Sequence, residues 1–387
     1  MNHMVFSYKK FHVIDVGFRR MHDCKLEQIV FGGGTPPVSR QAKLLGCMID
    51  SKLTFKPHIN MVTNKMKDVA FKLKKMAGTR SSVSPFELYT IFKSYIFPRG
   101  EYASCIWIFR VFLPYKRVFY KEAQNAGEIF NVALKPMFGY AKPWTALNRF
   151  YIDCMRRVIG ANESPSSVAV LVRMGVMPLQ YEFAYRAILW YIKITKGETD
   201  QVLTDQLDHM RSDDKRFART CFYQHCHNYI EELSKVGGVN LFDCEPTKRK
   251  KEIRRAMFLE LDRYWQGLSE ARITRSIHEK WEERRLPSFM RNRYTHTVMH
   301  RLALGRGPLR AVIHRRHDEN LQYCRYGCNA KEDARHVVMC CVKTKQKRDL
   351  IKRKCVKMQI EFTMKTIFSE IKLQDDVEDL LSVFLNT

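Results

Sequence analysis

The sequence predicts a mainly α-helical, multi-helical fold with a small N-terminal β element and a small separate module near the C-terminal end. Three observations indicate this. Apolar residues recur at steps of three and four over much of the chain, as they do on one face of a helix. Strand-like patterns are confined to residues 1–56. Two pairs of cysteines flank a histidine in "CRYGCNAKEDARHVVMCC", residues 324–341, which predicts a compact local cluster.

Composition predicts a chain with real cores and a polyanionic partner. Of the 387 residues, 45% are hydrophobic and 12% aromatic, and 67 lysines and arginines exceed 40 acids for a net charge of +27. Nucleic acid, RNA or DNA, is the first candidate partner, and an anionic membrane surface is the second. No apolar run approaches the roughly 18 residues of a membrane span, and no signal peptide is recognisable. We therefore expect an intracellular protein, nuclear or cytoplasmic, with reduced cysteines and no membrane partner.

The first stretch predicts short strands and turns. "KLEQIVFGGGTPP" is typical of a strand that ends at Phe31 and a turn over residues 32–36. The glycine triplet could cradle a phosphate, but no Gly-Lys-Ser/Thr follows it, so the turn interpretation is favoured. "QAKLLGCMIDSKLTF", from Gln41, predicts two short strands joined by a turn at Asp50 and Ser51.

A one-sided basic helix is predicted after Pro57, ending near Gly78. Its apolar residues lie at steps of three and four: Ile59, Val62, Met66, Val69, Leu73 and Met76. Lysines cover the rest of its surface, among them Lys65, Lys72 and Lys75. These lysines either form a solvated face or follow a nucleic-acid backbone, and the two interpretations are compatible.

Further helices are predicted downstream. Ser84 as a cap, Pro85 at the first helical position and Glu87 as the partner of a capping box predict a helix start. Helical patterns resume at Ala146 and recur over residues 177–197 and 218–236, whereas the polar residues 196–215 predict a loop.

A long basic region begins at "TKRKKEIRR", residues 247–255, and reaches about residue 316. Arginine forks bind phosphate and aromatic rings stack on bases, so their interleaving here favours nucleic-acid contact over a merely solvated face. The candidate contact residues are Lys248, Arg249, Lys250, Lys251, Arg291, Arg293, Arg301 and Arg306.

The cysteine cluster has the spacing of a structural zinc site. Cys324 and Cys328, with Gly327 between them, can form a turn around an ion, and His336 follows. His336 and Cys340 share a face of an ideal helix; Cys341 becomes the fourth ligand if the helix ends or tightens there. The alternative is a set of buried reduced cysteines that pack as small apolar residues. Four ordered ligands favour zinc, and four protein ligands make it structural rather than catalytic.

These pieces resemble reverse transcriptases of non-LTR (LINE-like, jockey-like) retrotransposons. "KLLGCMIDSKLTFKPHINMVTNKMKDVAFKLKKM" is similar to the family's "YLGV.LD..L.F..HI" and the basic thumb helix after the palm. "LYTIFKSYIFPRGEYASCIW" looks like the next family element, and "CMRRVIGANESPSSVAVLVRMGVMPLQYE" resembles "R.ITGA..T.S..AL....G..PL..E". The family's C-terminal zinc knuckle, Cys-x2/3-Cys-x7-His-x4-Cys, maps onto Cys324, Cys328, His336 and Cys341, so the resemblance favours Cys341 over Cys340. The resemblance runs from about residue 25 onward.

The resemblance implies six consecutive segments. They are a palm-end β remnant over 1–56, a thumb-like helical region over 57–110, a further helical region over 111–200, a basic helical or linker region over 201–318, a zinc-knuckle-like module over 319–345 and a C-terminal helical tail over 346–387.

The family's aromatic-Ala-Asp-Asp motif, which holds the metal ions of nucleotidyl transfer, does not occur here. The sequence therefore predicts a nucleic-acid-binding thumb-to-knuckle portion that does not polymerise alone. The alternatives are an active RNA-directed DNA polymerase completed by another chain, and a helical zinc-binding interaction protein of other ancestry.

Overall fold

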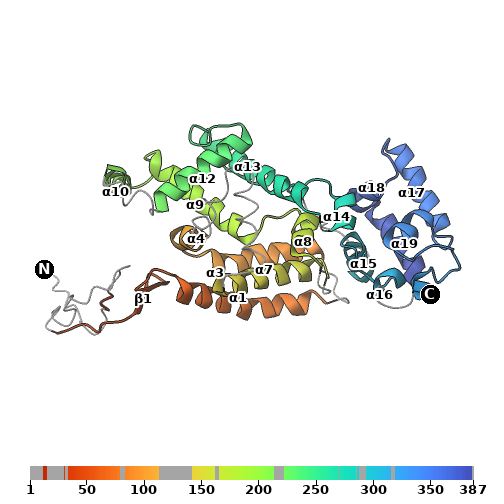
Figure 1. Ribbon diagram of the computed structural model, residues 1–387, viewed down its shortest axis with the longest axis horizontal. Helices are drawn as coiled ribbons and strands as arrows, with labels where there is room; N and C mark the ends of the chain where they lie inside the picture. Colours follow the sequence, from red (N-terminus) through yellow and green to blue (C-terminus); the bar gives the residue numbers. More distant parts are fainter. Residues whose placement is uncertain are drawn as a thin grey trace. The chain divides into compact units, whose positions relative to one another are not determined.

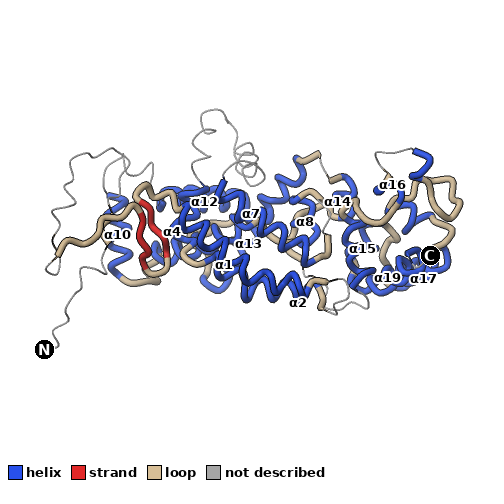
Figure 2. The backbone as a smooth tube through the Cα atoms, turned by 90° about the horizontal axis from the view of Figure 1, so that it is seen from below, coloured by secondary structure: helices blue, strands red, loops and turns tan. Residues whose placement is uncertain are grey.

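The computed structural model describes residues 12–14, 30, 34–78, 83–112, 142–161, 165–212, 222–269, 271–284, 286, 293–314 and 319–385. The described chain is mainly helical, as predicted, with a small two-stranded sheet (Figure 1; red in Figure 2). Several sequence features lie outside the described residues: the turn at 32–33, the stretch 113–141 and Arg291.

The elements of the first half, in order, are β1 (Gln41–Leu44), β2 (Cys47–Asp50), α1 (Lys56–Met76), α2 (Pro85–Ile91), the π-helix η3 (Phe92–Ile96), α3 (Phe97–Glu101), α4 (Ser104–Phe112), α7 (Lys142–Val158), α8 (Ser167–Met174), α9 (Leu179–Thr195) and α10 (Gln201–Ser212). The stretch 196–215, expected to be a loop, therefore contains the helix α10. Its composition is mostly polar, and among residues 201–208, whose side chains the structure describes, Leu207 is the one that is buried.

The elements of the second half are α12 (Phe222–Gly237), α13 (Pro246–Gly267), α14 (Arg272–Ile277), α15 (Arg293–Ala303), α16 (Arg310–Ile313), the 3-10 helix η5 (Glu319–Gln322), the π-helix η6 (His336–Cys340), α17 (Lys345–Lys357), α18 (Met364–Ser369), the 3-10 helix η7 (Ile371–Leu373) and α19 (Gln374–Leu385).

The chain divides into two compact units, and each gathers segments that are distant in sequence. The first unit comprises Met1–Lys67, Pro98–Leu147 and Arg186–Cys226. The second comprises Asp68–Phe97, Asn148–Tyr185 and His227–Thr387.

In the first unit, β1 and β2 form an antiparallel hairpin, but the turn that joins them is not the predicted one. The predicted turn at Asp50 is present, with the Leu53 N–H donating to the Asp50 carbonyl at 2.8 Å, and it follows the hairpin. The pairing runs from Gln41 opposite Asp50 to Leu44 opposite Cys47, so the turn is at Leu45 and Gly46. Gly46 has a φ of 85°, which suits glycine in a tight hairpin turn. Asp50 serves another purpose: its carboxylate accepts from the backbone N–H groups of Thr54 and Phe55 at 3.0 and 2.7 Å. It thereby holds the chain as it enters α1.

The predicted stripe of α1 is buried over most of its length. Ile59, Val62, Met66 and Leu73 are all 1% exposed or less, whereas Met76 is 36% exposed at the helix end. The capping box before α2 is also confirmed: the Glu87 N–H donates to Ser84 Oγ and the Ser84 N–H donates to the Glu87 carboxylate.

The second unit ends in a C-terminal core that continues through several short helices. α15 and α17 both pack on α19, and α14 packs on α15 and α18 (Figure 1). Apolar side chains of these elements form one buried cluster, which includes Val298, Val337, Ile351, Phe368 and Leu381. Two cysteines of the sequence motif, Cys324 and Cys341, belong to this cluster.

A chain of buried polar side chains crosses the same unit. Arg173 of α8 donates from Nε to His300 Nδ1 at 3.0 Å, and its Nη1 lies 2.9 Å from His278 Nε2. His300 Nε2 lies 3.0 Å from His296 Nε2, and His296 Nδ1 lies 2.9 Å from Glu378 Oε1. Because Arg173 must donate to His300 Nδ1, all of these hydrogen bonds can form when both histidines are neutral. His300 then donates from Nε2 to His296 Nε2, and His296 donates from Nδ1 to Glu378. Sequence periodicity gave no sign of this arrangement.

Candidate metal centre

Cys324 and Cys328 are brought together by a tight loop. An antiparallel bridge between Tyr323 and Lys331 closes the loop at its base, and the Cys324 N–H donates to the Ala330 carbonyl at 3.0 Å. Gly327 has a φ of 75°, a conformation that L side chains rarely adopt. The glycine thus lets the chain reverse just before Cys328, as the sequence predicted.

His336 and Cys341 are placed by a widened helical turn. The π-helix η6 is closed by the Cys341 N–H donating to the His336 carbonyl at 2.7 Å, five residues back. Asp333 Oδ1 accepts from the His336 N–H at 2.7 Å and fixes the start of the turn. The helix ends at this point, which is one of the two conditions under which the sequence predicted Cys341 as the fourth ligand. Its last turn widens, however, rather than tightening. Cys341 is therefore buried at the cluster, and Cys340 is exposed.

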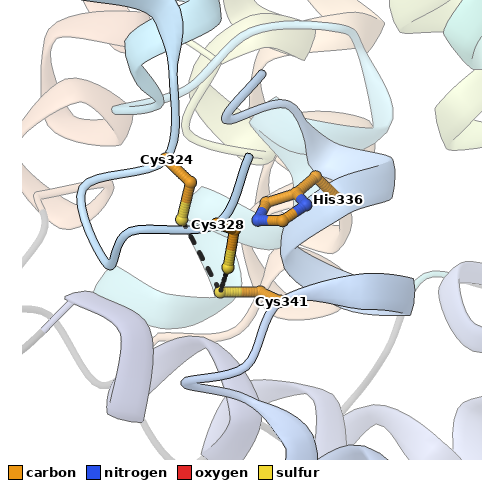
Figure 3. Close-up of side chains that lie close together, drawn as sticks. All are labelled: Cys324, Cys328, His336 and Cys341. Atoms are coloured by element: carbon orange, nitrogen blue, oxygen red, sulfur yellow. Dashed lines mark hydrogen bonds between the residues drawn. The ribbon is translucent and has the colours of Figure 1, made fainter. Parts of the chain in front are cut away.

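The four side chains converge on one point (Figure 3). Their ligand atoms all lie within 4.8 Å of one another. The Sγ atom of Cys341 lies 3.8 Å from that of Cys324 and 3.9 Å from that of Cys328. Tetrahedral Zn–S bonds of about 2.3 Å place sulfur atoms about 3.8 Å apart, so the spacing fits such an ion. Within the described ranges, this is the group of three or more His, Cys, Asp or Glu residues that could hold a metal ion.

The imidazole of His336 supplies an independent sign of a ligand. His336 is 6% exposed, and its Nε2 atom is buried without a hydrogen-bond partner. A buried polar atom without a partner is costly, and native structures rarely retain one. A metal ion bound among the three sulfur atoms would satisfy this nitrogen.

The thiols influence one another's ionisation. Burial and the neighbouring Cys324 raise the pKa of the Cys341 thiol to about 12. Burial also acts to raise the pKa of Cys328, but hydrogen bonds from the Val342 backbone and the two other thiols outweigh it and lower that pKa. Ionisation of Cys328 is thus favoured over that of Cys341, and a divalent cation would be needed to hold three thiolates together.

A buried carboxylate supports the loop from outside. Glu332 is fully buried, and its two oxygens accept from Arg325 Nε, Arg325 Nη2 and the Arg325 N–H at 2.6–3.0 Å. The same carboxylate accepts from the Arg310 N–H at 3.0 Å, and Arg325 also donates to the Pro308 carbonyl. This clamp was not predicted from the sequence, because Glu332 stands in "KEDAR", a charged run that is typical of a solvated surface.

The predicted nucleic-acid contacts divide into exposed and buried groups. The exposed members are Lys65, Lys72, Lys75, Lys248, Lys250 and Lys251. Arg249 and Arg293 are only 5% and 3% exposed, which corrects their interpretation as surface contacts. Arg293 donates from Nη2 to the Val158 carbonyl at 2.8 Å, and burial lowers its pKa to about 10. Arg301 and Arg306 are partly exposed, with Arg301 donating to the Gly160 carbonyl.

The fold and the site define a mainly helical protein with a largely buried group of three cysteines and one histidine that could bind a metal ion. Comparison of the chain with models of protein families, with curated proteins and with solved structures found no match. Among the helices described, none combines the length and apolar character needed to cross a membrane.

Proposed function

We propose that this chain is a nucleic-acid-binding protein related to the thumb-to-knuckle portion of non-LTR retrotransposon reverse transcriptases, with a structural zinc ion on Cys324, Cys328, His336 and Cys341. The observation that carries the proposal is the ligand geometry, because three sulfur atoms and an unpartnered imidazole nitrogen lie within 4.8 Å of one another, and two of the sulfur pairs have the spacing of a tetrahedral zinc site. The motif order in the sequence and the net charge of +27 support the choice of family and partner.

Zinc fits the ligand set better than magnesium or calcium. Thiolate and imidazole ligands select borderline-soft metals, whereas magnesium and calcium require oxygen. All four positions are filled by protein side chains, so the ion would organise the loop rather than activate water. Binding would offset the mutual repulsion of the thiolates and join residues 324–328 to η6.

The zinc assignment is tested by metal content and a matched pair of variants. We expect about one zinc per chain in the purified protein, kept in Cys340→Ser and lost in Cys341→Ser, because only Cys341 lies in the cluster. A protein without metal, or equal content in both variants, would overturn the assignment. Helical content, measured by circular dichroism, checks that the variants fold.

The nucleic-acid assignment is tested by the salt dependence of binding. We expect labelled RNA and DNA to bind with an observed association constant that falls steeply with salt, by about 0.7–0.9 log units per log unit of salt for each phosphate contact. A slope near zero, or no binding, would instead favour a zinc-containing interaction protein.

Primer extension addresses polymerase activity separately. Because the aspartate motif of the family does not occur in this sequence, we expect no metal-dependent nucleotide incorporation by this chain alone. Incorporation by the purified chain would contradict the proposal and support a complete active site.

A further inference from the structure

The helix α17, which follows the candidate metal centre, carries a dense positive charge. Between residues 331 and 365, eleven lysines and arginines accompany four acidic residues. The exposed cations of α17 are Lys345, Lys352, Arg353, Lys354 and Lys357. The nucleic-acid contacts predicted from the sequence lie elsewhere in the chain, and none of them is in this helix.

One face of α17 packs against the core and holds the helix in place. Arg348, Ile351 and Cys355 are buried, and α17 packs on α19. Arg348 donates from Nη1 to the carbonyl of Cys341 at 2.8 Å, and Thr344 Oγ1 donates to the Val337 carbonyl at 2.7 Å. The start of α17 is therefore tied directly to a candidate metal ligand and to η6, so its outer face is held in a defined orientation.

The cations of α17 fall into two classes. Lys354 pairs with Asp376 of α19 at 2.6 Å, and Lys347 lies 3.8 Å from Asp379. Lys345, Arg353 and Lys357 have no carboxylate partner in the part of the chain that the structure describes. Arg353 and Lys357 are four residues apart and therefore project from the same side of the helix.

The positions of the exposed cations on α17 fit a polyanionic backbone better than a membrane surface. Lys345 and Lys357 are separated by about 18 Å along the helix axis, at 1.5 Å per residue, which is long enough to meet several phosphates. An interfacial membrane helix needs a broad apolar face, but the apolar face of α17 is already buried. The exposed apolar side chains, Leu350 and Val356, stand singly between cations.

We infer that the solvent face of α17, formed by Lys345, Lys352, Arg353 and Lys357, contacts the sugar-phosphate backbone of RNA or DNA. This inference rests on the proposed function and names the surface through which part of the binding occurs. The contact is electrostatic, and α17 is oriented for it by the Cys341 segment. Lys347 and Lys354, which face the acids of α19, contribute less.

Two double variants with the same loss of charge test this surface. Arg353→Gln with Lys357→Gln removes two cations that have no carboxylate partner among the described residues, whereas Lys347→Gln with Lys354→Gln removes two that lie beside carboxylates of α19. Binding of labelled single-stranded RNA, single-stranded DNA and duplex DNA of equal length is measured by fluorescence anisotropy over a salt series. For the first variant we expect the magnitude of the log–log salt slope to fall by about 1.4–1.8, the value for two lost phosphate contacts.

The control variant should lose less than half as much slope, and thermal unfolding should show both variants to be folded. Equal loss in the two variants, with binding by the unaltered protein, overturns the role of α17 but leaves the proposed function standing. Absence of salt-dependent binding by the unaltered protein overturns both. If the Arg353→Gln, Lys357→Gln variant bound nucleic acid as the unaltered protein does but no longer bound phosphatidylserine vesicles, the face would be assigned to membranes and the inference rejected.

Discussion

At the scale of single residues, Glu332 shows how a charged side chain can organise a site without touching the ligand. Burial acts to raise its pKa, but hydrogen bonds from the Arg325 side chain and from the Arg325 and Arg310 backbone outweigh this effect and lower it. The carboxylate thus remains ionised while fully buried, with both oxygens occupied by donors. It joins the residue after Cys324 to the segment at Pro308 and Arg310, and so limits how far the first cysteine can move.

Replacing Glu332 by glutamine should weaken zinc binding without abolishing it. The amide keeps the shape but loses the charge and presents a donor toward Arg325, so the Cys324 loop should become less well positioned. Loss of an outer support of this kind costs about tenfold to a hundredfold in metal affinity. Competition with a chromogenic chelator measures the change, and Glu361→Gln, at an exposed position, serves as the control. An unchanged dissociation constant would show that the clamp is irrelevant to the metal.

At the scale of elements, local sequence explains helix starts better than it explains turns. The capping box at Ser84 and Glu87 was predicted because its residues act on neighbouring backbone groups. Asp50 and Ser51 were correctly expected at a turn, because Asp and Ser favour turns, but that turn leads into α1 and does not join the two strands of the hairpin.

Ser84→Ala should lower the free energy of unfolding by about 1 kcal/mol, because a helix N–H loses its side-chain acceptor. The Glu87 N–H donates to Ser84 Oγ at 3.2 Å in the intact box. Urea unfolding measures the change, and Ser94→Ala provides an exposed comparison that should stay within about 0.5 kcal/mol of the unaltered protein. Equal effects of the two substitutions would contradict the capping role.

At the scale of the whole molecule, the polar chain from Arg173 to Glu378 links α8, α15 and α19 within one compact unit. Burial, followed by the nearby arginines Arg173 and Arg284, lowers the pKa of His278. Burial and Arg173 also lower the pKa of His300, and burial lowers that of His296 despite the hydrogen bond to Glu378. All three histidines are therefore neutral in the folded protein near pH 7.

Acidification should consequently destabilise the fold. The pKa of each histidine is lower in the folded state than its unfolded value of about 6.5, so stability is complete above that pH and falls as the unfolded chain takes up protons below it. Each histidine contributes up to about 1.4 kcal/mol per pH unit. Urea unfolding between about pH 7 and pH 5 tests this, with chelator present to separate the effect from metal release.

The pH dependence should become shallower in His278→Gln and change much less in His227→Gln, because the His227 side chain is 38% exposed rather than buried. Stability that does not change between pH 7 and pH 5 would mean that the buried histidines do not control it.

The sequence by itself determined the helical class, the buried stripe of α1, the cap of α2 and three of the candidate metal ligands, Cys324, Cys328 and His336. Each of these follows from spacing along one segment, where side-chain direction is set by helix period or by a turn glycine. Tertiary structure decided the rest. It selected Cys341 over Cys340 through the widened turn η6, buried Glu332, Arg249 and Arg293, and assembled the histidine chain. From the sequence, a charged residue that is exposed to water cannot be told apart from one that is buried against a partner from a distant segment. Only the packed fold distinguishes these two environments.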